Sequence, residues 1–203
     1  MDPRQTIVTL DVEGVLVPEI WIAVAERTGI DALRRTTRDE PDYNALMRGR
    51  LALLAEHGLR MSMVEDVIAG LAPLPGAVDF LDDLRRRTQV VLLSDTFEQF
   101  ARPLMAQLGW PTLLCHSLVV EDDRIVDYRL RQADQKQHAV QALRSLNYRV
   151  VAAGDSYNDT NMLAAADAGF LFCAPPKVVA EFPQFPALDT YEDLRGAIIS
   201  ALG

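Results

Sequence analysis

The chain has 203 residues, of which 49% are hydrophobic and 24% are charged, and its formal net charge is −9. This size and composition fit a globular protein of one domain, or of one domain with a modest insertion. The acidic balance without a basic stripe argues against nucleic acid as a partner, and no apolar stretch approaches the length of a membrane span.

The first predicted element is a buried strand, and a helical segment follows it. Residues 6–10, "TIVTL", form a short apolar run. Residues 19 to about 72 then show almost only helical patterns, and "APLPG" (72–76) ends them with two prolines and a glycine. We therefore expect residues 18–73 to form a small helical cap domain, inserted into a core domain of residues 1–17 and 74–203.

The rest of the chain alternates between apolar runs and amphipathic stretches. Further strands, apolar on both faces as in a parallel sheet, are predicted at 89–93, 148–154 and 169–174. Helices are predicted at about 76–87, 97–108, 135–146 and 159–167. Residues 118–130 indicate two short strands around an acidic turn, hence a hairpin at the edge of the sheet. The alternation predicts an α/β fold with a Rossmann-like parallel sheet.

Polar residues follow three of the predicted strands, at the sheet edge where ligands bind in open α/β folds. They are Asp11 and Glu13, then Ser94 and Asp95, then Asp155, Asn158 and Asp159, while Lys136 opens a helix. Asp11 and Glu13 are two residues apart, so their side chains point the same way if the backbone stays extended. Several carboxylates in a small space repel one another, and a hard divalent cation relieves this, so we expect Mg²⁺.

These residues resemble the four motifs of the haloacid dehalogenase (HAD) superfamily. "DVEGV" (11–15) is similar to the first motif, Ser94 to the second, Lys136 to the third and "GDSYND" (154–159) to the fourth. The motifs occur in order across nearly the whole chain. Within the superfamily the chain resembles phosphoserine phosphatases, and "LDVEGVLVPEIW", "LLSDTF" and "AAGDSYNDTNML" resemble the bifunctional phosphoserine:homoserine phosphotransferase branch.

The resemblance implies a role for each of the two acids of the first motif. Asp11 would be the nucleophile that forms an aspartyl-phosphate. Glu13 would protonate the leaving alkoxide and then activate the acceptor. The side chains of Asp11 and Asp155, with the backbone carbonyl of Glu13, would hold Mg²⁺.

It also implies contacts to the phosphoryl group and to the metal. Ser94 and Lys136 would bind the phosphoryl oxygens, helped by the backbone at Asp95, where the family usually has glycine. Asp159 would orient the metal ligands, and Asn158 would contact the substrate.

Two residues of the insertion would grip the amino-acid part of the substrate. Glu19 would bind its ammonium and Arg50 its carboxylate. The sequence departs from most of the phosphatases at Glu13, where they carry aspartate.

The function implied is phosphoryl transfer from O-phospho-L-serine, through an aspartyl-phosphate, to water or to L-homoserine. Three alternatives are a plain phosphoserine phosphatase, a HAD phosphatase for another small phosphomonoester, and a non-catalytic sensor of phosphoserine or phosphate. The expected partners are these small molecules, with a homodimer possible and no nucleic acid or membrane. Cys115 and Cys173 lie in apolar runs and are expected to be buried free thiols, which suits the cytoplasm.

Overall fold

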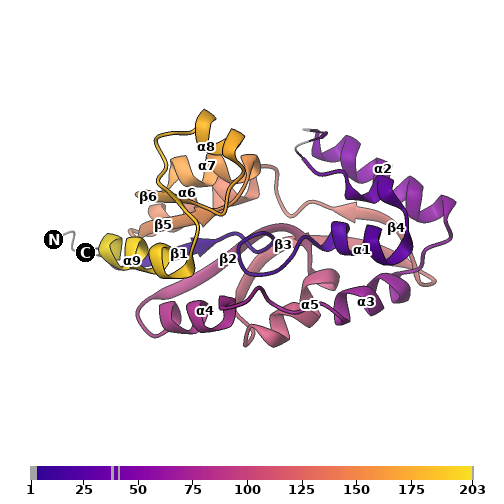
Figure 1. The fold of residues 1–203 in the computed structure, drawn as a ribbon, viewed down its shortest axis with the longest axis horizontal. Coiled ribbons are helices and arrows are strands. Elements are labelled where there is room, and N and C mark those ends of the chain that lie inside the picture. Colours follow the sequence, from indigo (N-terminus) through magenta and orange to yellow (C-terminus); the bar gives the residue numbers. More distant parts are fainter. Residues whose placement is uncertain (1–3, 38, 41, 203) are drawn as a thin grey trace.

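The computed structural model describes residues 4–37, 39–40 and 42–202, which are built around a seven-stranded sheet (Figure 1). The strands are β1 (Thr6–Leu10), β2 (Gln89–Phe97), β3 (Thr112–Glu121), β4 (Arg124–Arg129), β5 (Arg149–Gly154), β6 (Ala168–Phe172) and β7 (Ala187–Leu188). Their spatial order is β4-β3-β2-β1-β5-β6-β7. Among the pairs that these described strands form, only β3–β4 is antiparallel. The predicted α/β sheet, with a hairpin at its edge, is confirmed.

Helices cover both faces of this sheet (Figure 1). One face packs against α4 (Ala77–Arg85), α5 (Glu98–Gln107) and α9 (Tyr191–Leu202). The other packs against α6 (Gln135–Ser145), α7 (Thr160–Ala165) and α8 (Pro176–Glu181). Along β5, Val151 and Ala153 belong to the first core cluster, and Val150 and Ala152 to the second. This alternation explains why the strand is apolar on both faces.

The segment between β1 and α4 is helical, as predicted. It contains α1 (Ile20–Thr28), a short 3-10 helix (Asp31–Arg34), α2 (Tyr43–Glu56) and α3 (Met61–Ala69). These helices lie toward the β3–β4 end of the sheet, where α2 contacts β4 and α3 contacts α5 (Figure 1). The outgoing and returning chain meet where the N–H of Leu74 donates to the carbonyl of Leu16 at 2.9 Å. The division into a core and a cap domain stays a prediction.

Several boundaries differ from the sequence-based expectation. β3 begins at Thr112 rather than near residue 118, because its first half adds in parallel to β2 through residues such as Leu113. α8, β7 and α9 were not predicted.

The expected burial of both cysteines is wrong. Both are free thiols, but Cys115 is only partly buried and Cys173 is exposed. Cys173 follows the last residue of β6, where the chain turns with φ 48°, and so leaves the core. Among the helices of the described residues, none combines the length and apolar character needed to cross a bilayer.

Candidate active site

Asp11 and Lys136 form a buried ion pair at the end of β1. Asp11 directly follows β1, and its backbone N–H donates to the carbonyl of Ala153 on β5 at 3.0 Å. Nζ of Lys136 lies 2.8 Å from Oδ1 of Asp11 and 2.7 Å from Oδ1 of Asp159. Burial alone would lower the pKa of Lys136, but Asp11, Asp159 and Asp95 raise it well above its ordinary value. The lysine is therefore a fixed cation.

The pKa of Asp11 moves in the opposite direction from that of a typical ion-paired carboxylate. Burial, together with the charges of Asp159 and Asp155, raises it well above its ordinary value, although Lys136 acts to lower it. The ionised form of Asp11 therefore has too little positive charge around it in the protein alone.

The turn after β5 brings two more carboxylates next to Asp11. Asp11, Asp155 and Asp159 each offer an oxygen within 4.8 Å of the others, so this cluster could hold a metal ion. Oδ2 of Asp159 accepts the backbone N–H groups of Asp155 and Ser156 at 3.0 and 3.1 Å, and its Oδ1 accepts from Lys136. Both oxygens of Asp159 are therefore engaged by groups of the protein.

Two glycines that sequence reasoning missed make this cluster possible. Gly14 has φ +79°, and a Cβ there would collide with the carboxylate of Asp155. A Cβ at Gly154 would collide with the side chain of Asp159. The available signal was their position, since each adjoins a motif acid, at "EG" and "GD".

Glu13 connects the strand end to the first helix of the insertion. β1 ends at Leu10, so the extended backbone does not continue, yet Asp11 and Glu13 still line the same cavity. Oε2 of Glu13 accepts the backbone N–H of Ile20, the first residue of α1, at 2.9 Å. Burial raises the pKa of Glu13, although the Ile20 N–H and Thr96 lower it. A carboxyl with a raised pKa is suited to carry a proton at neutral pH.

Arg50 faces the acids from α2. It is only 8% exposed, its guanidinium lies 4.6 Å over the ring of Trp21, and its Nη2 donates to the carbonyl of Arg35 at 2.8 Å. Its buried Nε has no hydrogen-bond partner among the described residues. Burial lowers the pKa of Arg50 to about 10, so it remains a cation. Glu19, directly before α1, lines the same cavity.

The second-motif residues, Ser94 and Asp95, accept hydrogen bonds from side-chain amides. The Ser94 carbonyl and the Asp95 carboxylate both accept from the side chain of Gln135. Oδ2 of Asp95 accepts from Nδ2 of Asn158 at 2.9 Å. The hydroxyl of Tyr43 donates to the backbone carbonyl of Asp95 at 2.8 Å. Gln135 and Tyr43 were not predicted; Gln135 had one signal, its position next to Lys136.

Nine of the ten predicted site residues line one small cavity of about 80 Å³; they are Asp11, Glu13, Glu19, Arg50, Ser94, Asp95, Lys136, Asp155 and Asn158. The tenth, Asp159, is fully buried behind them. A neighbouring cavity of about 400 Å³ shares five wall residues with the first, namely Thr37, Tyr43, Asp95, Lys136 and Asn158. Since small-molecule sites usually exceed about 300 Å³, the two together give room for a ligand.

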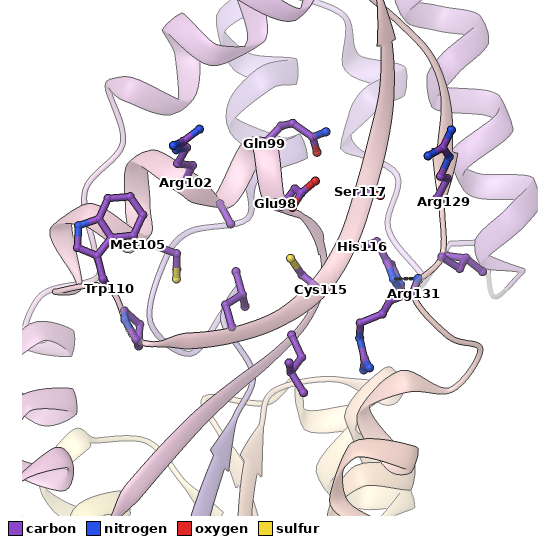
Figure 2. A pocket seen from close by; sticks show the side chains of 15 residues that line it. Glu98, Gln99, Arg102, Met105, Trp110, Cys115, His116, Ser117, Arg129 and Arg131 are labelled. Carbon is purple, nitrogen blue, oxygen red and sulfur yellow. Dashed lines mark hydrogen bonds between the residues drawn. The ribbon is translucent and has the colours of Figure 1, made fainter. Parts of the chain in front are cut away.

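A larger cavity, about 830 Å³, lies elsewhere, between α5, β3 and residues 129–131 (Figure 2). None of the carboxylates beside Lys136 lines it. Its wall includes His116, which also borders the 400 Å³ cavity.

Known proteins with similar sequences are phosphoserine phosphatases. Phosphoserine phosphatase ThrH of Pseudomonas aeruginosa is 63% identical over 196 residues, 96% of each chain. A phosphoserine phosphatase of Pseudomonas syringae pv. tomato is 60% identical over 96% of this chain and 83% of its own length. A substrate-bound phosphoserine phosphatase structure, 21% identical, matches with a TM-score of 0.78 over 98% of this chain and 99% of that chain, which shows a common fold.

The model of one family also matches most of the chain. It is described as haloacid dehalogenase-like hydrolase and covers residues 6–167, which include the strand end with Asp11, Lys136 and the turn with Asp155 and Asp159. The chain belongs to the haloacid dehalogenase-like hydrolases.

Proposed function

We propose that this protein transfers the phosphoryl group of O-phospho-L-serine to Asp11 and from there to water or to L-homoserine. The observation that carries the proposal is the buried pair of Asp11 and Lys136, 2.8 Å apart, in a cavity that Arg50 also lines. A carboxylate held beside a fixed cation is equipped to attack phosphorus while the cation binds a phosphoryl oxygen. The names of the two close relatives support phosphoserine as the donor.

In the first step, an oxygen of Asp11 attacks phosphorus and the bond from phosphorus to the serine oxygen breaks. Glu13, whose pKa is raised by burial, gives its proton to the departing serine oxygen. In the second step, the ionised Glu13 takes a proton from water or from the homoserine hydroxyl. That oxygen attacks phosphorus and releases Asp11. Phosphate or phosphohomoserine is the product.

The donor set fits Mg²⁺. The candidate ligands are all oxygens, and the cluster is a buried group of carboxylates with the cation Lys136 beside it. The side chains of Asp11 and Asp155 and the backbone carbonyl of Glu13 would hold the ion, and Asp159 would orient Asp155 through its backbone N–H. When bound, Mg²⁺ would supply the positive charge that the raised pKa of Asp11 indicates is missing.

Arg50 and Glu19 would hold the amino-acid part of the substrate. Nε of Arg50 has no hydrogen-bond partner among the described residues although the side chain is buried, and a substrate carboxylate would satisfy it. Ser94, Lys136, Asn158 and the backbone at Asp95 would hold the phosphoryl oxygens. The helical insertion would thus act as a cap that supplies specificity. We also propose that the protein is cytoplasmic and that it can form a homodimer. Analytical ultracentrifugation would test the dimer.

The test is phosphorus NMR of phosphoserine incubated with the protein and Mg²⁺, with and without homoserine. We expect inorganic phosphate in the first case and additional phosphohomoserine in the second, and neither in EDTA or with folded Asp11→Asn. Phosphate alone in both cases would identify a plain phosphoserine phosphatase. Turnover of other phosphomonoesters but not of phosphoserine would overturn the donor, and binding without turnover would indicate a sensor.

A further inference from the structure

Asp95 holds the amide of Asn158 in one orientation. Nδ2 of Asn158 donates to Oδ2 of Asp95 at 2.9 Å. On the other side of the amide, the hydroxyl of Ser156 donates to Oδ1 of Asn158. An amide offers two hydrogens and one carbonyl oxygen, so these two contacts leave one N–H of Asn158 for a ligand in the cavity.

Asp95 is itself held from two directions. Nε2 of Gln135 donates to its Oδ1 at 3.1 Å. His116 is 4% exposed, and its Nδ1 accepts the backbone N–H of Arg131 at 3.1 Å (Figure 2). Because Nδ1 accepts, a ring hydrogen is assigned to Nε2, which faces Oδ1 of Asp95 at 3.6 Å.

Asp95 is ionised at neutral pH. Burial alone would raise its pKa, but Lys136, His116, Asn158 and Gln135 lower it well below its ordinary value. A carboxylate only accepts hydrogen bonds, so it accepts the N–H₂ end of Asn158 and repels the carbonyl end. In the flipped amide, the oxygen of Asn158 would face the phosphoryl oxygens, and like partial charges would repel.

We propose that Asp95 is a positioning residue that acts through Asn158, turning one amide N–H of Asn158 toward the bound phosphoryl group. Gln135 and His116 keep the carboxylate in place. The inference deepens the proposed function, because it requires that a phosphoryl group bind in this cavity. It does not depend on which ester or acceptor carries that group.

The proposal predicts that the effects of Asp95 and Asn158 are coupled. The test is a double-mutant cycle with Asp95→Ala and Asn158→Ala, measuring kcat and KM for an aryl phosphate and the inhibition constant of inorganic phosphate. Each single variant should lower kcat/KM by about tenfold or more, the size of one hydrogen bond to a charged oxygen. The double variant should be no worse than Asn158→Ala alone.

Inorganic phosphate gives a second readout, because Asp95 also lies 3.8 Å from Lys136. If Asp95 acts through Asn158, phosphate should bind more weakly to Asp95→Ala, but not more weakly to the double variant than to Asn158→Ala. If Asp95 mattered only through its charge, Asp95→Ala would bind phosphate more tightly, and the proposal would be wrong. Effects that multiply in the double variant would also overturn it.

Tyr43→Phe is the matched control. It removes the hydrogen bond to the backbone carbonyl of Asp95 and leaves the carboxylate in contact with Asn158. The effect of Tyr43→Phe on kcat/KM should multiply with that of Asn158→Ala. If Tyr43→Phe were coupled to Asn158→Ala as strongly as Asp95→Ala is, the coupling would point to general loosening of the site. Asp95→Asn serves if Asp95→Ala does not fold. If no ester is turned over, the same double-mutant cycle can be measured from the binding of phosphate in the presence of Mg²⁺ by calorimetry. This binding readout separates the present proposal from the proposed function.

Discussion

The ammonium of Lys136 lies 2.8 Å from the carboxylate of Asp11, and both side chains are almost completely buried, at 4% and 5% exposure. Lys136→Met would leave Asp11 and Asp159 without this cation. Breaking such a buried pair costs about 3–5 kcal/mol, so we expect a loss of that size in the free energy of unfolding, measured in urea with EDTA at pH 7.

Lys177 provides the control for Lys136. Its side chain is 79% exposed and lies 3.9 Å from Glu181 on the same helix. Lys177→Met should change stability by less than about 1 kcal/mol. Equal losses in the two variants would contradict the view that Lys136 neutralises the acidic cluster.

Arg50→Ala should weaken the use of phosphoserine far more than the use of an aryl phosphate, which has no α-carboxylate for the guanidinium to bind. The measurement is kcat/KM for both substrates. Arg48→Ala is the matched control, because Arg48 is on the same helix but 63% exposed and paired with Asp127 at 3.0 Å. Equal losses on both substrates would show that Arg50 does not select the amino-acid part.

Gly14→Ala should disturb the metal site. The new Cβ would collide with Asp155, and φ +79° costs a residue with a side chain about 1–2 kcal/mol. We expect lower stability in thermal or urea unfolding and a higher Mg²⁺ concentration for half-maximal activity. An unchanged Mg²⁺ requirement in Gly14→Ala would contradict this.

Gly49→Ala is the control for Gly14→Ala. Gly49 lies within α2, and a Cβ there would meet no described atom within 4 Å beyond its chain neighbours and the backbone of its own helix. Alanine is the better helix former, so this variant should be more stable than wild type by about 0.5–1 kcal/mol, with the same Mg²⁺ requirement.

The sequence predicts the residues whose position follows from the strand pattern. An apolar run that stops at an acid identifies Asp11, and the same rule finds Asp155 after β5. The residues that contact Asp95 carry no such signal. Tyr43 and His116 are of ordinary types, and they reach Asp95 only because α2 and β3 come together in the tertiary structure.

Asp167 allows a test of pH dependence away from the site. It accepts from Arg4 at 3.1 Å and from the backbone N–H of Val150 at 2.9 Å. Burial alone would raise its pKa, but the Val150 N–H and Arg4 lower it. The pKa of an aspartate in the unfolded chain is about 3.9. Because the pKa of Asp167 is lower than this in the folded protein, its ionised carboxylate stabilises the fold at pH values above about 3.9, and this stabilisation is lost as the pH falls through the folded-state pKa.

Asp167→Asn should therefore lower the free energy of unfolding by about 1–2 kcal/mol at pH 7, and the difference in this free energy from wild type should shrink below about pH 4. Urea unfolding at pH 7, 5 and 3 measures it. Asp31→Asn, at a side chain 90% exposed, should show little change at any of these pH values. If the loss of unfolding free energy in Asp167→Asn stayed constant down to pH 3, the charge of Asp167 would not be what stabilises the folded protein.

Glu13 is the residue expected to influence which acceptor is used. Its Oε2 already reaches the backbone N–H of Ile20 at 2.9 Å, so the carboxylate spans from the end of β1 to the start of α1. Glu13→Asp removes one methylene and withdraws the carboxylate by about 1.5 Å. A general base must lie within about 3.2 Å of the atom whose proton it takes, so this change matters.

Water and homoserine should respond differently to that withdrawal. Water can follow the shortened side chain. Homoserine, with its α-ammonium bound by Glu19 and its α-carboxylate bound by Arg50 as proposed, cannot move its hydroxyl as freely. Glu13→Asp should therefore lower transfer to homoserine more than hydrolysis, and Glu13→Gln should lower both, because an amide cannot carry the proton. The measurement is the ratio of phosphohomoserine to free phosphate at saturating homoserine. A ratio in Glu13→Asp equal to or above that of wild type would show that the length of Glu13 does not select the acceptor.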